Sequence, residues 1–350
     1  MSPASQDCRL SETRIRGLRA LVLENSLLSV TVLPEKGCDI YSFVCRKTGV
    51  DILWKSPWGL QRTPAETEAQ WLDQYEGGWQ VLFPNGGDAC VYEGALLPFH
   101  GEACLREWDA EIVQDGGGSV CLRFSVELCR SPFALSRTLR LEKNRPALFI
   151  TERIENRSRM AMPYLWGHHP AFGSPFLAGG CRIVVPAREF QAHEEEVSPW
   201  CRLPAGYRGQ WPLLPGKAGT PVDMSIVPRQ EERVTEFGYL LDLEDGWYAV
   251  MNHEAGLAFG LAWDKQVFPC LWFWQELGGC DTPPWYGRCY VMAIEPFCAY
   301  PGTGLADALK RGGVPWLAGG ASIETSLAAV CFEPGAVASV GLDGTVRRKP

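Results

Sequence analysis

The sequence lacks long apolar runs and lacks an excess of basic charge. No stretch approaches the ~20 consecutive apolar residues that a membrane helix requires, and residues 1–18 contain no apolar segment of signal-peptide length. Acidic residues outnumber basic ones by 41 to 33, so the net charge is −8 and the pI is near 5.3. A nucleic-acid or anionic membrane partner would require a basic face. These absences predict a cytoplasmic protein that binds neither nucleic acid nor membranes.

Recognised nucleophile, metal and cofactor motifs are also missing. The chain has no G-x-S-x-G elbow, no H-E-x-x-H, no phosphate-binding P-loop and no dinucleotide G-x-G-x-x-G after a strand. Its 14 cysteines are scattered without a C-x-x-C pair, which favours buried or half-buried thiols over disulfides or a zinc site. The sequence therefore predicts neither a metal nor a cofactor.

Turn residues and alternating patterns are abundant instead. The 37 glycines and 26 prolines indicate many turns. Over residues 119–128 the even-numbered positions are apolar and most odd-numbered positions are polar, which is typical of a half-buried antiparallel strand. Similar alternation over residues 133–142, followed by the strand-like residues 147–156, predicts an antiparallel meander of three strands.

The strand pattern extends over most of the chain, and helical patterns are short. The best helix candidates are residues 67–78 and 304–312. An all-β chain of this length, with about twenty strands, must stack two large antiparallel sheets face to face. We therefore predict one domain over residues 1–350. Residues 198–228, rich in proline and glycine, are predicted to be a long loop excursion of the kind that often shapes a binding site.

Two motifs contain histidines that could act as acids or bases. PFHGE contains His100 and Glu102, which should share one face of an extended segment. WGHHPAF contains His168 and His169, which should point to opposite sides of a strand that ends at Pro170, so only one of them faces a cleft. Each histidine could instead be a core residue whose ring nitrogens are satisfied by the backbone.

A carboxylate and an amide complete the set of candidate polar groups. Glu295, in AIEPF, lies deep at the end of an apolar strand, where burial raises a carboxyl pKa and makes the group a better base. A salt bridge with Arg288 would have the opposite effect. Asn85, in FPNGG, follows a strand that breaks into a turn, where its amide could bind a ligand or cap its own turn.

The ordered motifs FPNGG, PFHGE, HHPAF and AIEP resemble the aldose 1-epimerase (galactose mutarotase) family, in its broader branch. The segment LPEKGCDIYSFVCRKTGVDILW is similar to the start of that family, and the similarity extends over about residues 20–340. The resemblance implies a galactose mutarotase-like β-supersandwich. It also implies that neither a metal nor a cofactor is needed.

The resemblance also assigns roles to three residues. Glu295 matches the general base on the anomeric hydroxyl, and His169 matches the general acid toward the ring oxygen. His100 matches the histidine that binds and polarises the anomeric region. The Asn-Arg pair in the first loop of the family is replaced here by Asn85–Gly86, which leaves open how the sugar hydroxyls are held.

The leading hypothesis is a mutarotase that interconverts the α and β anomers of a free monosaccharide. The reaction removes the C1 hydroxyl proton and protonates the ring oxygen, and positioned acid and base groups suffice for it. The predicted substrate-binding residues are Asn85, Glu102, His168, Trp274 and Arg288. The protein is expected to be a monomer or a homodimer.

Three alternatives remain open. A hexose-phosphate mutarotase would need arginines at the mouth of the cleft, for which the candidates are Arg106, Arg182 and Arg288. Another isomerase, a lyase or a hydrolase could use the same fold. A sugar-binding protein without turnover would stack its ligand on tryptophans. The candidate tryptophans, which could equally fill the core, are Trp79, Trp274 and Trp285.

Overall fold

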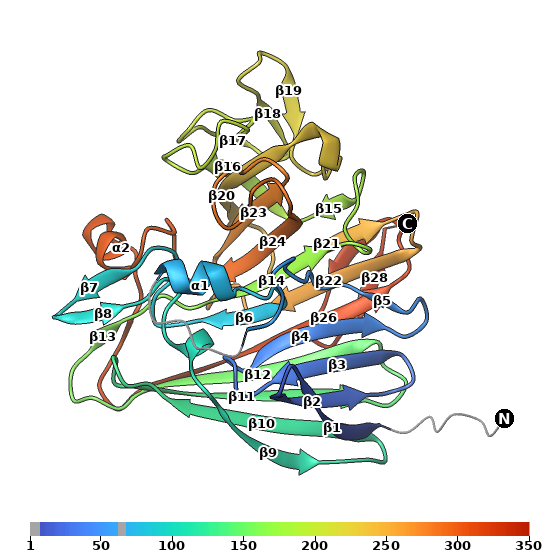
Figure 1. The fold of residues 1–350 in the computed structure, drawn as a ribbon, viewed down its shortest axis with the longest axis vertical. Coiled ribbons are helices and arrows are strands. Elements are labelled where there is room, and N and C mark those ends of the chain that lie inside the picture. The colour runs from blue at the N-terminus through green and yellow to red at the C-terminus, as the bar shows by residue number, and fades with distance from the viewer. Residues whose placement is uncertain (1–7, 62–67, 350) are drawn as a thin grey trace.

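Two large antiparallel sheets, stacked face to face, make up most of the molecule (Figure 1). This computed structural model describes residues 8–61 and 68–349. One sheet has 12 strands and the other has 8. The architecture confirms the prediction of an all-β supersandwich built from large antiparallel sheets.

The larger sheet has the strand order β1-β2-β3-β4-β6-β14-β24-β23-β20-β16-β17, with β5 paired to β4. Its strands are β1 (Arg9–Ile15), β2 (Leu18–Glu24), β3 (Leu28–Leu33), β4 (Asp39–Cys45), β5 (Val50–Asp51), β6 (Trp79–Leu82), β14 (Gly167–Gly173), β16 (Ala187–Ala192), β17 (Arg208–Gln210), β20 (Val234–Leu243), β23 (Cys270–Leu277) and β24 (Tyr290–Phe297).

The smaller sheet has the order β15-β21-β22-β26-β12-β11-β10-β9. Its strands are β9 (Asp109–Gln114), β10 (Ser119–Glu127), β11 (Phe133–Glu142), β12 (Ala147–Asn156), β15 (Arg182–Val184), β21 (Trp247–Asn252), β22 (Leu257–Trp263) and β26 (Ser322–Phe332). Strands β10, β11 and β12 pair in sequence order, as the predicted meander requires.

Side-chain alternation explains why the two sheets stack. In β10 the even-numbered residues from Val120 to Val126 are buried, whereas Arg123, Ser125 and Glu127 are exposed. One large cluster of buried apolar side chains includes residues of both sheets, so the main core lies between them. Eleven of the 14 cysteines are buried, in agreement with the prediction of buried thiols.

Short strand pairs and helices surround the sandwich. The pairs are β7 (Cys90–Tyr92) with β8 (Ala95–Leu97), β13 (Met162–Pro163) with β25 (Trp316–Leu317), β18 (Leu213–Pro215) with β19 (Pro221–Asp223), and β27 (Val337–Val340) with β28 (Val346–Arg348). The helices are α1 (Glu68–Gln74) and α2 (Leu305–Arg311), with single 3₁₀ turns at Ala103–Leu105 and Gln230–Glu232.

Both predicted helices are present, but the predicted loop excursion is only partly a loop. The segment 198–228 contains β17, which extends the edge of the larger sheet, and the hairpin β18–β19 (Figure 1). Its strands are three residues long, too short to produce an alternating pattern in the sequence. Among the described residues, neither helix is long and apolar enough to span a bilayer.

Candidate functional site

A break in backbone pairing lies in the middle of the larger sheet. Strand β14 pairs with β24 at Gly167 and again from Ala171, but not in between. Counting two residues inward from either end places His169 opposite Glu295. Pairing with β6 continues through Pro170, so β14 runs past the proline at which we predicted it to end. Backbone pairing with β6 keeps β14 extended at Pro170, although a proline cannot donate a backbone hydrogen bond.

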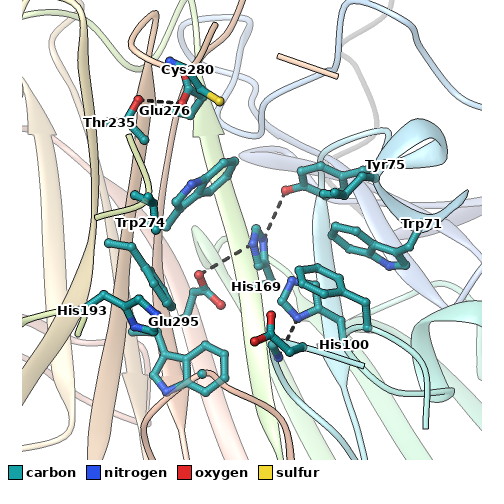
Figure 2. Close-up of a pocket in the computed structure, with 18 of the residues that line it drawn as sticks. Trp71, Tyr75, His100, His169, His193, Thr235, Trp274, Glu276, Cys280 and Glu295 are labelled. Atoms are coloured by element: carbon teal, nitrogen blue, oxygen red, sulfur yellow. Dashed lines mark hydrogen bonds and ion pairs between the residues drawn. The ribbon is translucent and has the colours of Figure 1, made fainter. Parts of the chain in front are cut away.

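His169 and Glu295 point from this break into a cavity of about 260 Å³, together with His100 (Figure 2). Strands β20 and β23 form one wall of the cavity, and α1 and the loop that carries His100 form the opposite wall. The three predicted catalytic residues, which lie up to 195 positions apart in the chain, therefore meet in one cavity. Trp274, predicted to contact the substrate, also lines it.

The His169–Glu295 pair is deeply buried. His169 Nε2 lies 3.6 Å from Glu295 Oε1, and the exposed fractions of the two side chains are 5% and 2%. Burial raises the pKa of Glu295 well above its usual range and lowers the pKa of His169 to about 4. Glu295 Oε2 is buried and has no hydrogen-bond partner among the described residues. A neutral carboxyl beside a neutral imidazole is therefore favoured in this cavity.

Tyr75, which no sequence motif marks, positions the imidazole of His169. Its hydroxyl lies 3.2 Å from His169 Nδ1. Trp71 stacks on the Tyr75 ring at a centroid distance of 4.8 Å and meets the ring of His100 edge-on at 4.6 Å. Trp71 and Tyr75 are four positions apart in the sequence, a spacing that places two residues on one face of a helix. That spacing was the available signal in the sequence, but it does not say what the face covers.

A tight turn places His100 in the cavity. The backbone of His100 is left-handed, with φ of 62°, so PFHGE is not the extended segment that we predicted. Its Nδ1 accepts a hydrogen bond of 3.1 Å from the backbone N–H of Gly87, which leaves Nε2 to carry the proton of the neutral ring. Burial, and to a lesser extent His169, lowers the pKa of His100 well below its usual range. His100 thus has a neutral ring with one N–H donor.

The turn also separates Glu102 from the cavity. The Glu102 carboxylate accepts hydrogen bonds from the backbone N–H groups of Cys129 and Arg130 and from the hydroxyl of Ser131, at 2.8–3.1 Å. These three donors satisfy the buried carboxylate in a neighbouring loop. Glu102 is therefore not among the residues that line the cavity, contrary to its predicted role in substrate binding.

His168 points into the interior between the two sheets. Its Nδ1 accepts a hydrogen bond of 3.2 Å from Trp79 Nε1, and its Nε2 lies 3.2 Å from Glu152 Oε2 on β12 of the smaller sheet. Glu152 is also paired with Arg137 on β11, at 2.9 Å. Adjacent residues in a strand face opposite sides, so only His169 can reach the cavity. Neither His168 nor Trp79 lines the cavity, so the structure does not place them in contact with a sugar there as the sequence suggests.

Asn85 and Arg288 also lie outside the cavity lining. The Asn85 amide donates to the carbonyls of Asp88 and Pro98 at 2.8 and 2.9 Å, and its oxygen accepts from the N–H of Leu305 at 2.7 Å. Asn85 therefore joins the loop of His100 to α2 and has no amide hydrogen left for a sugar. Arg288 is exposed, donates to the Pro284 carbonyl at 3.0 Å, and does not pair with Glu295.

Several lining residues were not predicted from the sequence. No sequence motif indicates which side of their elements faces the cavity. These residues are Asp88, His193, Thr235, Phe237, Trp272, Glu276 and Cys280. The register shows why the strand residues among them belong together, since Thr235 pairs with Glu276, and Trp272 pairs with Glu295. Directly paired residues share one face of a sheet. The described residues contain no group of three or more His, Cys, Asp or Glu side chains arranged to hold a metal ion.

The sandwich, with its cavity on the larger sheet, has the fold of galactose mutarotase-like proteins. A protein named "putative aldose 1-epimerase" from Klebsiella pneumoniae superposes with a TM-score of 0.68 at 18% identity, covering 91% of this chain and 80% of its own. A galactose mutarotase-like protein from Clostridium acetobutylicum superposes with a TM-score of 0.62 at 14% identity, covering 94% and 100%. A galactose mutarotase-like protein from Lactobacillus casei superposes with a TM-score of 0.61 at 18% identity, covering 89% of this chain and 100% of its own.

The chain belongs to the family described as "Domain of unknown function (DUF4432)", whose model matches residues 15–330. No curated protein matches the chain. At 12–18% identity the solved structures show the fold alone. The function has to be argued from the cavity.

Proposed function

We propose that the protein is an aldose 1-epimerase, a mutarotase that interconverts the α and β anomers of a free aldose. One observation carries the proposal: a buried carboxyl, Glu295, with one unpartnered oxygen, lies 3.6 Å from the imidazole of His169 in a cavity walled by tryptophans. An unsatisfied buried oxygen that faces a cavity indicates a ligand with hydroxyl donors. At about 260 Å³ the cavity is smaller than the ~300–1,000 Å³ of drug-sized pockets, which suits a monosaccharide.

In the proposed reaction His169 and Glu295 share one transferable proton. Passing it from the carboxyl to the imidazole across the Nε2–Oε1 contact creates a carboxylate base and an imidazolium acid. Glu295 then takes the C1 hydroxyl proton while His169 protonates the ring oxygen, and the bond between C1 and the ring oxygen breaks. After rotation about C1–C2, the reverse transfers close the ring on its other face. Each positioned proton transfer contributes roughly 10²–10⁴ in rate.

Tyr75 and His100 support this cycle. The Tyr75 hydroxyl can accept from Nδ1–H of His169 in both protonation states, which holds the ring and leaves Nε2 of the neutral imidazole free to take the proton. The Nε2–H of His100 is a neutral donor that can polarise an oxygen at the anomeric centre. Trp274, with its ring centroid 5.7 Å from that of His169, offers an apolar face to the sugar C–H groups.

The test is anomer exchange by wild-type protein and by Glu295→Gln. We expect wild-type protein to accelerate mutarotation of at least one aldose in a panel of hexoses and pentoses, followed by polarimetry or by NMR exchange. Glu295→Gln should lose about 10²–10⁴ of that acceleration, because the amide cannot accept the C1 proton, and it should still bind the sugar in calorimetry. Glu254→Gln, which removes a charge from an exposed turn, is the matched control and should remain active.

Two results would contradict the proposal. Wild-type protein that accelerates no hexose or pentose is not a mutarotase for free aldoses. If it nevertheless binds a sugar, and Glu295→Gln binds that sugar equally well, the protein is a sugar-binding protein without turnover.

A further inference from the structure

Three residues of β23 form a row along one wall of the cavity: Trp272, Trp274 and Glu276. Trp272 lies opposite Glu295 in the β23–β24 register. Glu276 is four residues further along the strand, which corresponds to about 13 Å at ~3.3 Å per residue. Trp274 lies between these two levels on the same face. A sugar held by Glu295 at its anomeric end and lying over Trp274 therefore points its far end toward Glu276 (Figure 2).

The Glu276 carboxylate is held in place by two donors. The Thr235 hydroxyl donates to Oε2 at 2.9 Å, and the backbone N–H of Cys280 donates to Oε1 at 3.0 Å. The residue is 1% exposed and lines the cavity. Two carboxylate oxygens offer about four acceptor positions, so each oxygen can accept a further hydrogen bond from a ligand. The carboxylate is thus a fixed acceptor at the end of the cavity remote from His169.

No basic side chain offsets the acidic groups around this cavity. Among the described lining residues, Asp88 and Glu276 are acidic in addition to the neutral carboxyl of Glu295, and none is lysine or arginine. Burial lowers the pKa of each lining histidine, His100, His169 and His193, so these rings stay neutral near pH 7. The electrostatic environment beside Glu276 therefore disfavours an anionic group on the sugar.

We infer that Glu276 determines substrate specificity by accepting hydroxyl hydrogens at the far end of the sugar and by excluding sugars that carry a phosphate or carboxylate there. The inference rests on the proposed function and names its substrate class: aldoses that are uncharged, or positively charged, away from the anomeric carbon. Selection of this kind combines an attractive contact for one ligand with like-charge repulsion against another. It also disfavours the hexose-phosphate alternative, because Arg106, Arg182 and Arg288 do not line the cavity.

The test compares glucose, glucosamine, glucose 6-phosphate and glucuronate as probes. If wild-type protein turns over the neutral or amino sugar, we expect its kcat/KM for both anions to be at least about 100-fold lower. In Glu276→Gln the ratio of kcat/KM between the neutral sugar and the anions should fall by about 10-fold or more. It should also raise KM for glucose while kcat is retained, because the side chain lies far from the reacting atoms. Glu254→Gln should leave the discrimination unchanged.

The two proposals fail in distinguishable ways. Equal turnover of glucose and glucose 6-phosphate, or unchanged discrimination in Glu276→Gln, would overturn the role of Glu276 and leave mutarotation intact. If no sugar is turned over, the proposed function fails. Calorimetry with wild-type protein then tests the role of Glu276 through sugar binding alone. Binding of glucose or glucosamine without binding of the two anions would then support the role of Glu276. Equal binding, or no binding at all, would overturn it.

Discussion

At the scale of single residues, Glu295 combines the chemical role proposed above with a cost to stability. Its carboxyl is buried, its charged form is disfavoured by that burial, and no guanidinium or ammonium group compensates it among the described residues. Its pKa in the folded state therefore lies above the ordinary value of ~4.3 in the unfolded chain. Folding is favoured by this group below about pH 4.3, and that advantage is lost as the pH rises through the folded-state pKa.

Glu295→Gln should consequently stabilise the protein above about pH 5. Glutamine fills the same space without a proton to lose, so the difference in unfolding free energy should grow with pH. We expect about 0.5–2 kcal/mol at pH 8, the usual size of a single stabilising substitution. Thermal or urea unfolding of both proteins between pH 4 and pH 9 measures it. A difference that is constant across this range would show that Glu295 has an ordinary pKa.

At the scale of elements, Asn85 holds together three segments beside the cavity. Its hydrogen bonds reach Asp88, Pro98 and the first residue of α2. His100 lies two residues after Pro98, and its own N–H donates to Gly87. One buried amide thus fixes the turn that presents the His100 ring.

Asn85→Ala should loosen this junction. It removes the three hydrogen bonds to backbone groups and leaves buried carbonyl and N–H groups unsatisfied, at a cost of about 2–4 kcal/mol in unfolding free energy. Because the His100 turn is no longer fixed, kcat/KM should also fall in the protein that remains folded. Urea unfolding and mutarotation kinetics at low temperature measure the two effects. Lost stability with unchanged kcat/KM would mean that the turn keeps its shape without Asn85.

Strand alternation predicted the elements better than it predicted their ends or the turns between them. The meander β10–β12 and both helices follow from local patterns of apolar residues, which record burial directly. The left-handed backbone of His100 left no comparable signal, and Glu102 was therefore placed on the wrong side. The sequence did not indicate Glu276 because its place in the cavity depends on pairing between β20, β23 and β24, and register is a long-range property that one strand does not encode.

At the scale of the whole molecule, a buried ionic network connects the two sheets. Arg137 and Glu152 belong to the smaller sheet, and His168 belongs to the larger one. Arg137 also donates to the Cys38 carbonyl at 3.0 Å. Burial by itself raises the pKa of Glu152, but the neighbouring His168 and Arg137 outweigh it, and the pKa is lowered. This contribution to stability is present above about pH 4.3 and is lost at more acidic pH.

Glu152→Gln should destabilise the molecule by about 3–5 kcal/mol, because it leaves the fully buried Arg137 without a counter-charge. Glu127→Gln is the matched control, since Glu127 pairs with Arg157 on the exposed surface and should cost at most about 1 kcal/mol. Urea unfolding at pH 7 compares the two variants. Equal, small losses would mean that the network contributes little to holding the sheets together.

Because His168 and His169 are adjacent and face opposite sides of the sheet, β14 cannot change its register by one residue without misplacing both. A shift of one position along the strand would move His169, the proposed proton donor, into the interior between the sheets and the ring of His168 into the cavity. The contact of His168 with Glu152 between the sheets and the proposed turnover would both be lost. We therefore expect related sequences to lack insertions or deletions of a single residue in this strand.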